Sequence, residues 1–317
     1  MLADELLTDQ LTIHKRAMRL MGNRFEISVI TPDAGHAEKC IDAAVSEITR
    51  IEKLLTTFSE DSQTNLINRN AGLQPVKVDA EVFQLVARSL KISSLTQGAF
   101  DITYGSIDKS LWNFDVTMTA LPDAETARKA VRLINYHNVI LNSANCTIFL
   151  KEKGMRIGFG GIGKGYAADR AKMILKQMGI NSGVVNASGD LTAWGIQPNG
   201  QKWRIGVADP DQRGQLLAHM NITDLSVATS GNYEKYVEIA GKRYSHTIDP
   251  RTGLPVSGIK SVTIITTSAE IADALATPVT IMGVYAGLDM INQINDVEAI
   301  VIDDNNRVYT SKNITLN

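Results

Sequence analysis

Helix-like and strand-like segments are interleaved along this chain without the regular strand–helix–strand repeat that builds a parallel sheet. Apolar residues at helical spacing mark residues 36–55, 80–95, 122–136, 165–178 and most of 270–294. Alternation or short apolar runs mark strands at 25–30, 139–141, 147–150, 183–187 and 299–302. Residues 202–266 have the pattern of short strands and turns, including a hairpin over 236–244. This order predicts an α+β fold of mixed helices and largely antiparallel sheets, not a doubly wound α/β fold.

The composition excludes several classes of protein but names no function. With 44% hydrophobic residues, the chain is able to bury a large core. Its 32 basic and 34 acidic residues leave a net charge of −2, whereas nucleic-acid-binding proteins usually carry a basic surplus. We therefore expect no nucleic-acid partner. The two cysteines are too few for a disulfide scaffold or for a zinc site built from thiolates.

The hydropathy of the chain bears on its location. No segment has the run of roughly 18 apolar residues that marks a membrane-spanning helix, so we expect no membrane span. Residues 1–5 lack the basic and apolar regions of a secretory signal. As the chain stands, we expect a cytoplasmic location. A periplasmic lipoprotein whose leader has been removed is the alternative, and it stays open.

A glycine-rich loop between a predicted strand and a predicted helix is the strongest local signal. Five of the eight residues from Gly158 to Gly165 are glycine, so backbone N–H groups here can approach a phosphate closely. Gly158, Gly160 and Gly163 fit the dinucleotide-binding pattern G-x-G-x-x-G, but the acidic residue expected about 20 positions later is missing. Lys164 completes G-x-x-x-x-G-K, but Gly165 stands where a Ser or Thr would bind magnesium. A tight turn that binds nothing is the alternative.

Two further segments carry candidate catalytic groups. Asp273 and Thr277 are four residues apart in a predicted helix, so their oxygens share one face. A carboxylate and a hydroxyl together suit magnesium, although an Asp at a helix terminus and a core-facing Thr would give the same pattern. His246 precedes an Asp-Pro-x-x-Gly turn among hydroxyl groups, where an imidazole suits general-base catalysis near neutral pH. A structural histidine is the alternative.

Two shorter segments are less specific. Asp101 stands between Phe100 and Ile102, so its carboxylate needs a partner if it is buried. The segment Ser188–Asp190 follows an apolar strand and is typical of a turn. This turn either borders the glycine-rich loop or is purely structural.

Taken in order, these motifs resemble the FAD:protein FMN transferase family, whose members are also called ApbE-like proteins. The resemblance covers about residues 18–310, and it rests on the ordered set because each motif is weak alone. It implies an ApbE-like, T-fold-related architecture, with an N-terminal extension over 1–17, one integrated domain over 18–317 and a soft subdivision near 137. The matching segments are Met21–Phe25, Phe58–Asn68, Gly98–Asp101, Gly160–Asp169, Asn186–Asp190, Ala228–Gly231, Ser245–Pro250 and Ala272–Thr277.

The resemblance also implies an activity and the residues that perform it. Members of the family cleave FAD and attach FMN through a phosphoester bond to a Thr or Ser of a target flavoprotein, releasing AMP, with magnesium as the metal ion. The implied metal ligands are Asp273, Thr277 and the backbone carbonyl of Gly161, and we expect His246 to be the catalytic base. The implied FAD contacts are Met21, Phe58, Ala99, Phe100, Asp101, Gly158, Lys164 and Thr247.

Other functions stay open at this point. Some members of the family hydrolyse FAD to FMN and AMP, and the same fold would also serve a non-catalytic FAD-binding protein. Gly158 stands where many members have Asp, which alters one expected FAD contact. Pro278, directly after Thr277, is expected to bend the predicted metal-binding helix. A Rossmann-type oxidoreductase rests on the glycine pattern alone, and the surrounding sequence does not support it.

Overall fold

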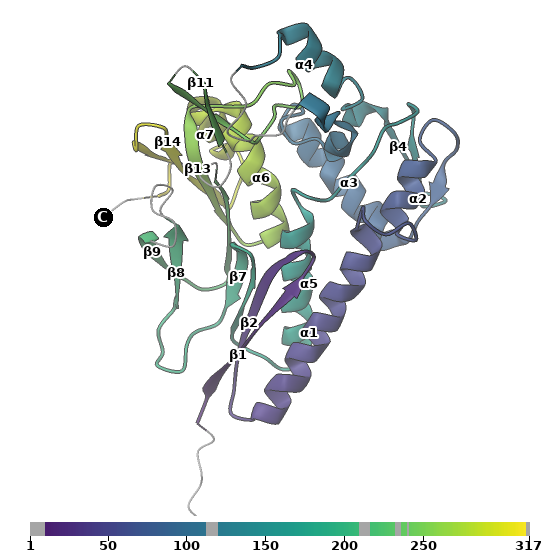
Figure 1. Ribbon diagram of the computed structural model, residues 1–317. Coiled ribbons are helices and arrows are strands. Elements are labelled where there is room, and N and C mark those ends of the chain that lie inside the picture. The colour runs from purple at the N-terminus through teal and green to yellow at the C-terminus, as the bar shows by residue number, and fades with distance from the viewer. Residues whose placement is uncertain (1–9, 112–119, 209–215, 232–235, 240, 315–317) are drawn as a thin grey trace, which may run out of the picture.

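The computed structural model of the protein describes residues 10–111, 120–208, 216–231, 236–239 and 241–314. Its largest element is an eight-stranded antiparallel sheet in the order β1-β2-β6-β7-β10-β13-β14-β15. The antiparallel pairing confirms the predicted α+β class and excludes a Rossmann fold, which needs parallel strands. The strands, shown in part in Figure 1, are β1 (Thr12–Leu20), β2 (Asn23–Thr31), β6 (Gly183–Ala187), β7 (Asp190–Trp194), β10 (Leu225–Gly231), β13 (Ile259–Thr266), β14 (Val297–Asp303) and β15 (Val308–Thr310).

Three helices, α1 (Ala34–Leu55), α5 (Gly163–Gln177) and α6 (Ala269–Met282), cover one face of this sheet. In Figure 1, α5 lies between α1 and α6, and it packs against both. The spacing of apolar residues in α1 was predicted correctly: Asp33 caps the helix, and its apolar stripe is buried against the sheet. The buried residues of that stripe are Ile41, Ala44, Ile48, Ile51 and Leu55.

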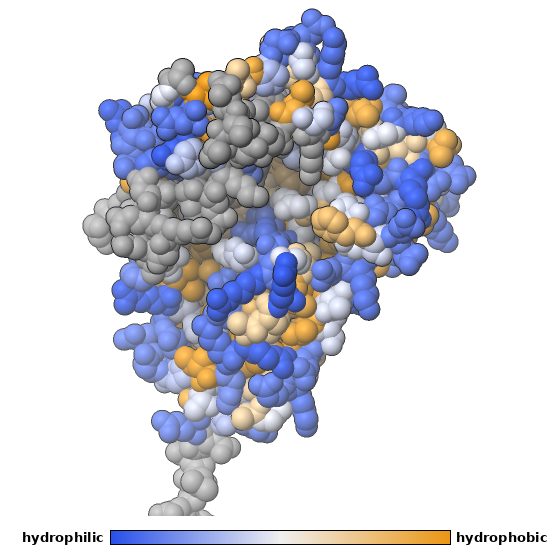
Figure 2. Space-filling model, in the orientation of Figure 1, coloured by the Kyte–Doolittle hydropathy of each residue, from blue (hydrophilic) through white to orange (hydrophobic). Residues whose placement is uncertain are grey.

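Smaller elements complete the fold on both sides of the main sheet. The hairpin of β8 (Trp203–Ala208) and β9 (Leu216–Ile222) packs on the sheet face opposite the helices. The remaining strands pair as β3-β5-β4 and β11-β12. On the face drawn in Figure 2, hydrophilic residues predominate and apolar side chains gather in separate patches. The remaining elements are α2 (Gln63–Arg69), β3 (Val76–Lys77), α3 (Ala80–Leu95), η1 (Ile102–Ser106), η2 (Lys109–Leu111), α4 (Ala124–Val131), η3 (Tyr136–Asn138), β4 (Val139–Asn142), β5 (Thr147–Leu150), β11 (Tyr236–Ile239), β12 (Lys242–Ser245) and α7 (Val284–Ile291).

One core runs through the molecule. The main cluster of buried apolar residues extends from Phe25 in β2 to Val301 in β14 and includes residues on both sides of position 137. Strand β1 begins at Thr12 and pairs with β2 along its whole length, so it crosses the expected boundary between residues 17 and 18. Among the described residues, no helix is long and apolar enough to cross a membrane.

One predicted helix was too long, and the mostly helical segment over 270–294 is divided at Gly283. The helix predicted over 122–136 ends at Val131, because the N–H groups of Asn135 and Tyr136 are drawn to Thr103 Oγ1 (2.8 Å) and Asp101 Oδ2 (3.0 Å). The helix predicted over 270–294 is two helices, α6 and α7, which are separated at Gly283, where φ is 86°. Pro278 lies inside α6 without ending it.

Strand β1 and helix α2 are among the elements that the sequence patterns missed. Strand β1 is an edge strand on which exposed and half-buried residues alternate, so few strongly apolar residues mark it. Helix α2 has only seven residues, which is too short for a helical period to show. The predicted hairpin over 236–244 forms as β11 and β12, while Ala240 at its turn lies outside the described residues.

Helices α1 and α5 are joined by ion pairs at a partly buried position. Glu47 on α1 accepts hydrogen bonds from Arg50 at 2.8 Å and from Arg170 on α5 at 2.8 Å. The hydrogen bond from Arg50 lowers the pKa of Glu47 to about 2, with burial opposing and Arg170 adding to the shift. The folded protein therefore favours the ionised form of this carboxyl.

We expect Glu47→Gln to lower the free energy of unfolding at neutral pH by about 2 kcal/mol, because the charge that both guanidinium groups need is removed. Since the folded pKa is depressed, the stabilisation is fully present above the ordinary value of 4.5 and is lost as the pH falls towards 2. Urea denaturation at pH 7, 5 and 3 measures this trend. A difference that does not change with pH would contradict the assignment. Glu38→Gln is the control, since its pair with Arg16 is exposed.

Candidate active site

The glycine-rich loop leads from the buried Ile157 into helix α5, and its start is held in place by hydrogen bonds. The N–H of Ile157 donates to Asn68 Oδ1 at 2.8 Å, and the Asn68 amide donates back to the Ile157 carbonyl at 3.1 Å. The N–H of Gly158 donates to the carbonyl of Ile102 at 3.0 Å. Helix α2 and the η1 turn therefore fix the loop in front of a helix N-terminus, where the helix dipole stabilises an anion.

Lys164, in the first turn of α5, lies between two buried carboxylates. Its Nζ is 2.5 Å from Asp190 Oδ2 and 3.3 Å from Asp273 Oδ1. The other carboxylate oxygen of Asp273 accepts the backbone N–H of Gly165 at 3.0 Å. Asp190 and Asp273 are 8% and 7% exposed at their side chains, so both charges depend on these contacts.

The electrostatics of this cluster follow from its burial. Burial, reinforced by the neighbouring charge of Asp273, raises the pKa of Asp190 to about 7, with Lys164 opposing the shift. Burial also disfavours the ammonium of Lys164, but Asp273 and Asp190 outweigh this and raise its pKa above the ordinary value. The cluster therefore keeps a charged ammonium at the N-terminus of α5, directly after the glycine-rich loop.

Asp190 reaches the cluster from a tight turn. Strands β6 and β7 are joined at Ser188 and Gly189, whose φ values are 58° and 102°, and Asn186 accepts the N–H of Gly189. The predicted turn at Ser188–Asp190 therefore exists, but Asp190 itself is the first residue of β7. The alternative that this turn borders the glycine-rich loop is confirmed, because Asp190 contacts Lys164.

A carboxylate from α5 fixes the start of α6. Asp169 accepts hydrogen bonds from Ser268 Oγ (2.8 Å) and from the N–H groups of Ala269 and Glu270 (3.0 Å each). These N–H groups belong to the first turn of α6, which has no partners for them within the helix. Asp169 thereby sets the position of Asp273, which lies one turn further along α6.

The N-termini of α5 and α6 approach so closely that only glycine fits at position 165. A Cβ placed on Gly165 would lie 2.0 Å from the carbonyl oxygen of Ala269 and 2.8 Å from the Cβ of Asp273. A Cβ placed on Gly160, in the same loop, would meet no atom within 4 Å. The two glycines therefore have different roles, packing at 165 and an open backbone at 160.

We expect Gly165→Ala to destabilise the protein by about 2 kcal/mol or more, because the backbone of α6 must move to admit the methyl group. Gly160→Ala is the matched control and is expected to change the free energy of unfolding by less than about 1 kcal/mol. Chemical denaturation of the two variants beside the wild type measures both changes. Equal destabilisation of the two variants would show that the close approach at position 165 is unimportant.

The residues that the resemblance implies as metal ligands offer oxygen atoms only. Asp273 is buried and Thr277 is half-buried on α6, and a Cβ placed on Gly161 would lie 3.5 Å from the ring of Phe100. Asp273 Oδ1 faces an ammonium group, so its surroundings already stabilise a positive charge. Among the described residues, no cluster of three His, Cys, Asp or Glu side chains is placed to bind a metal. A carboxylate, a hydroxyl and a carbonyl nevertheless fit magnesium, which prefers such ligands.

Asp101 stabilises the segment beside the glycine-rich loop, where the carbonyl of Ile102 accepts the N–H of Gly158. Its Oδ1 accepts the N–H and the hydroxyl of Thr103 at 2.8 and 2.6 Å, and its Oδ2 accepts the N–H of Tyr136. Burial raises the pKa of Asp101, although these hydrogen bonds favour its charged form. Ala99 and Phe100 are buried beside it. A cavity of roughly 380 Å³ adjoins Asp101 and is lined by Ser94, Gln97, Gly98, Ile134, Asn135, Tyr136, His137, Pro250 and Arg251.

Met21 and Phe58 lie at the glycine-rich loop from two other directions. Met21 occupies the β1–β2 turn with φ of 50°, and its Cε is 3.7 Å from the position that a Cβ on Gly163 would take. Phe58 follows α1 and is 98% exposed. Its neighbour Thr57 contacts the position that a Cβ on Gly158 would take, at 4.0 Å. A fully exposed aromatic side chain at a loop of this kind is available to stack on a ligand.

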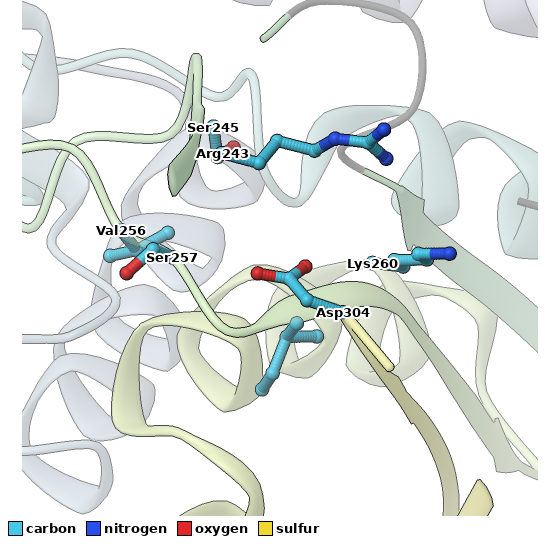
Figure 3. Close-up of a pocket in the computed structure, with 7 residues that line it drawn as sticks. Arg243, Ser245, Val256, Ser257, Lys260 and Asp304 are labelled. Atoms are coloured by element: carbon cyan, nitrogen blue, oxygen red, sulfur yellow. The ribbon is translucent and has the colours of Figure 1, made fainter. Parts of the chain in front are cut away.

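His246 and Thr247 follow strand β12 and enter the turn at Asp249. His246 is exposed, and Thr247 is buried with its N–H donating to Ser245 Oγ at 2.9 Å. Figure 3 shows the small pocket beside Ser245, in which the Asp304 carboxylate lies between Ser257 and Lys260. With a volume of about 10 Å³, this pocket has room for a water molecule but not for a substrate.

The structure brings most of the expected site residues together. Contacts with the glycine-rich loop and α5 join Met21, Phe100, Gly161, Lys164 and Asp273 into one region. His246 and Thr247 belong to a separate turn, and their part in the site stays a prediction.

Sequence reasoning missed the roles of three polar residues in this region. Asn68 clamps the start of the glycine-rich loop, Asp169 caps α6, and Asp190 pairs with Lys164. All three lie inside the matching motifs, but their partners are far away in the sequence, so spacing alone gave no signal.

The comparisons with known proteins agree with this geometry. The sequence model of the ApbE family matches residues 21–301. The chain is 33% identical over 294 residues to an FAD:protein FMN transferase of Klebsiella pneumoniae, covering 92% of this chain and 90% of the relative. The crystal structure of the ApbE protein from Thermotoga maritima superposes with a TM-score of 0.83 at 30% identity, covering 95% and 97% of the two chains. The apo flavinyl transferase ApbE of Pseudomonas stutzeri superposes with a TM-score of 0.82 at 26% identity, covering 96% of each chain. The chain belongs to the ApbE family.

Proposed function

We propose that this protein is a magnesium-dependent FAD:protein FMN transferase. It cleaves the pyrophosphate of FAD, attaches FMN through a phosphoester bond to a Thr or Ser of a target flavoprotein, and releases AMP. The observation that carries the proposal is the buried Lys164–Asp273 pair directly after the glycine-rich loop, in a chain similar to named FAD:protein FMN transferases. A site that only bound flavin would not require a buried carboxylate beside its phosphate-binding loop.

In this proposal the pyrophosphate of FAD lies at the N-terminus of α5. The loop supplies backbone N–H groups, and Lys164 supplies a charge that is already desolvated and therefore strongly felt by an anion. Met21, Ala99, Phe100 and Asp101 would border the nucleotide, with Gly158, Phe58 and Thr247 as the remaining expected contacts.

Asp273, Thr277 and the carbonyl of Gly161 would hold the magnesium ion. When bound, the ion neutralises phosphate charge and polarises the phosphorus that is attacked. The protein's own contribution is to keep Asp273 oriented, which the N–H of Gly165 and the capped start of α6 achieve. The rate enhancement then depends mainly on positioning and on electrostatic stabilisation.

His246 would act on the acceptor hydroxyl. The imidazole accepts the proton as the hydroxyl oxygen bonds to the phosphorus of the FMN portion, and the bond from that phosphorus to the bridging oxygen breaks. The bridging oxygen leaves with AMP. The exposure of His246 favours this role, because the side chain of another protein must reach it.

We expect wild-type protein incubated with FAD and magnesium to release AMP when a candidate acceptor flavoprotein is present and to label the acceptor with covalent flavin. Chromatography of the nucleotides and in-gel flavin fluorescence measure the two products. AMP without acceptor indicates an FAD pyrophosphatase, and no AMP under either condition indicates a binding protein. Asp273→Asn is expected to reduce both products at least about 100-fold, because the metal loses its charged ligand.

We expect His246→Ala to retain FAD binding while flavin transfer falls about 100-fold or more, since general-base catalysis is typically worth that much. Fluorescence titration measures binding, and the rate of acceptor labelling measures transfer. His36→Ala, in the first turn of α1, is the control and should leave both binding and transfer unchanged. Full transferase activity of the His246 variant would remove it from the mechanism.

A further inference from the structure

Lys164 is shared unequally by its two carboxylates. The distance from its Nζ is 2.5 Å to Asp190 Oδ2 but 3.3 Å to Asp273 Oδ1. The two acids come from different elements, since Asp190 opens strand β7 and Asp273 lies on α6. One ammonium group therefore links a strand to a helix at the centre of the candidate site, and it is held more closely by the strand.

The two oxygens of Asp273 differ in what they face. Oδ2 accepts the N–H of Gly165 at 3.0 Å, which fixes the orientation of the carboxylate. Oδ1 faces the ammonium of Lys164, so a metal ion that binds there must share this oxygen with a fixed positive charge. Like charges a few ångströms apart repel strongly in a poorly solvated site. A metal ion can bind at Oδ1 only if another group holds the ammonium away from it.

Asp190 is placed to hold it. We propose that Asp190 is a positioning residue: it retains the Lys164 ammonium beside β7, so that the contact of the ammonium with Asp273 Oδ1 stays the longer of the two and this oxygen can bind the metal ion. This inference rests on the metal site of the proposed function but goes beyond it, because Asp190 is not among the metal ligands. Without Asp190, Asp273 would be the one carboxylate left to the ammonium, which would then approach Oδ1 more closely than its present 3.3 Å and compete with the metal ion.

The charges of the cluster support this division of roles. With both carboxyls ionised, Lys164, Asp190 and Asp273 together carry a net charge of −1, and a bound divalent ion changes this to +1, which suits an anionic pyrophosphate. If Asp190 were absent, Lys164 and Asp273 would form a neutral pair. A neutral pair attracts a divalent ion far less than the intact cluster does.

The test is a double-mutant cycle on metal affinity, measured without FAD by the electron paramagnetic resonance signal of free Mn²⁺. We expect Asp190→Asn to weaken Mn²⁺ binding at least about tenfold relative to wild type, since Lys164 then competes for Asp273. Lys164→Met together with Asp190→Asn is expected to bind Mn²⁺ within about threefold of Lys164→Met alone, because no competitor remains. Asp296→Asn, the same chemical change at an exposed turn, is the control and should bind like wild type.

Two results would overturn the inference. If Asp190→Asn binds Mn²⁺ like wild type, or weakens binding equally with and without Lys164, Asp190 does not act through the ammonium. The inference and the proposed function fail differently. If Asp273→Asn loses Mn²⁺ binding while Asp190→Asn binds like wild type, the inference fails but the proposed metal site stands. Mn²⁺ binding that no variant changes overturns both. Thermal melts of all variants confirm folding, and the double variant, which removes both members of an ion pair, guards against misfolding of Asp190→Asn.

Discussion

The close contact between the N-termini of α5 and α6 sets the positions of Lys164 and Asp273 in the candidate site. Gly165 lets the two helices approach until its Cα lies against the carbonyl of Ala269. Asp169 secures the same joint from the other side by capping the first turn of α6. Because this contact fixes the two helices, it also fixes the distance between Lys164 and Asp273. The last glycine of the glycine-rich loop, Gly165, therefore serves the packing of the two helices.

Within the described part of the chain, the charged groups of this site are paired with one another and not with the rest of the protein surface. The chain as a whole is nearly neutral, yet it gathers two buried carboxyl groups and a half-buried ammonium in one hydrogen-bonded cluster. Burying a charge is costly unless a partner is supplied, and here each partner comes from a different secondary-structure element. Under the proposed function, recognition of an anionic dinucleotide would need no basic surface, because a helix N-terminus, one lysine and one cation would provide the positive potential.

The sequence predicted the helices better than it predicted the contacts. Helix α1 followed from its apolar spacing, because this signal is local. The end of α4 did not, because it depends on Asp101 and Thr103, which are about thirty residues away in the sequence and accept the N–H groups that would otherwise continue the helix. Tertiary hydrogen bonds of this kind leave no periodic trace.

The candidate site shows the same division. Lys164, Asp273 and Thr277 were predicted to form a phosphate and metal site because the ordered set of motifs resembles one family, although each motif is weak alone. Asp190 was interpreted as part of a turn, and only the fold shows its carboxylate against Lys164. The register of the strands decides which side chains face α5. Register depends on how the strands pair, so it cannot be predicted from the sequence of one segment.

The parts of the site are spread over most of the chain, from Met21 in the β1–β2 turn to Asp273 in α6. They meet only when an antiparallel sheet has joined its first strands to its last. Such long-range closure is entropically slow, and it makes contact order, not local helix formation, the determinant of when the site appears. During synthesis, Lys164 and Asp190 leave the ribosome before Asp273, so the nascent chain carries an incomplete ion cluster until α6 emerges. The complete ion cluster is therefore formed late in the folding of this protein.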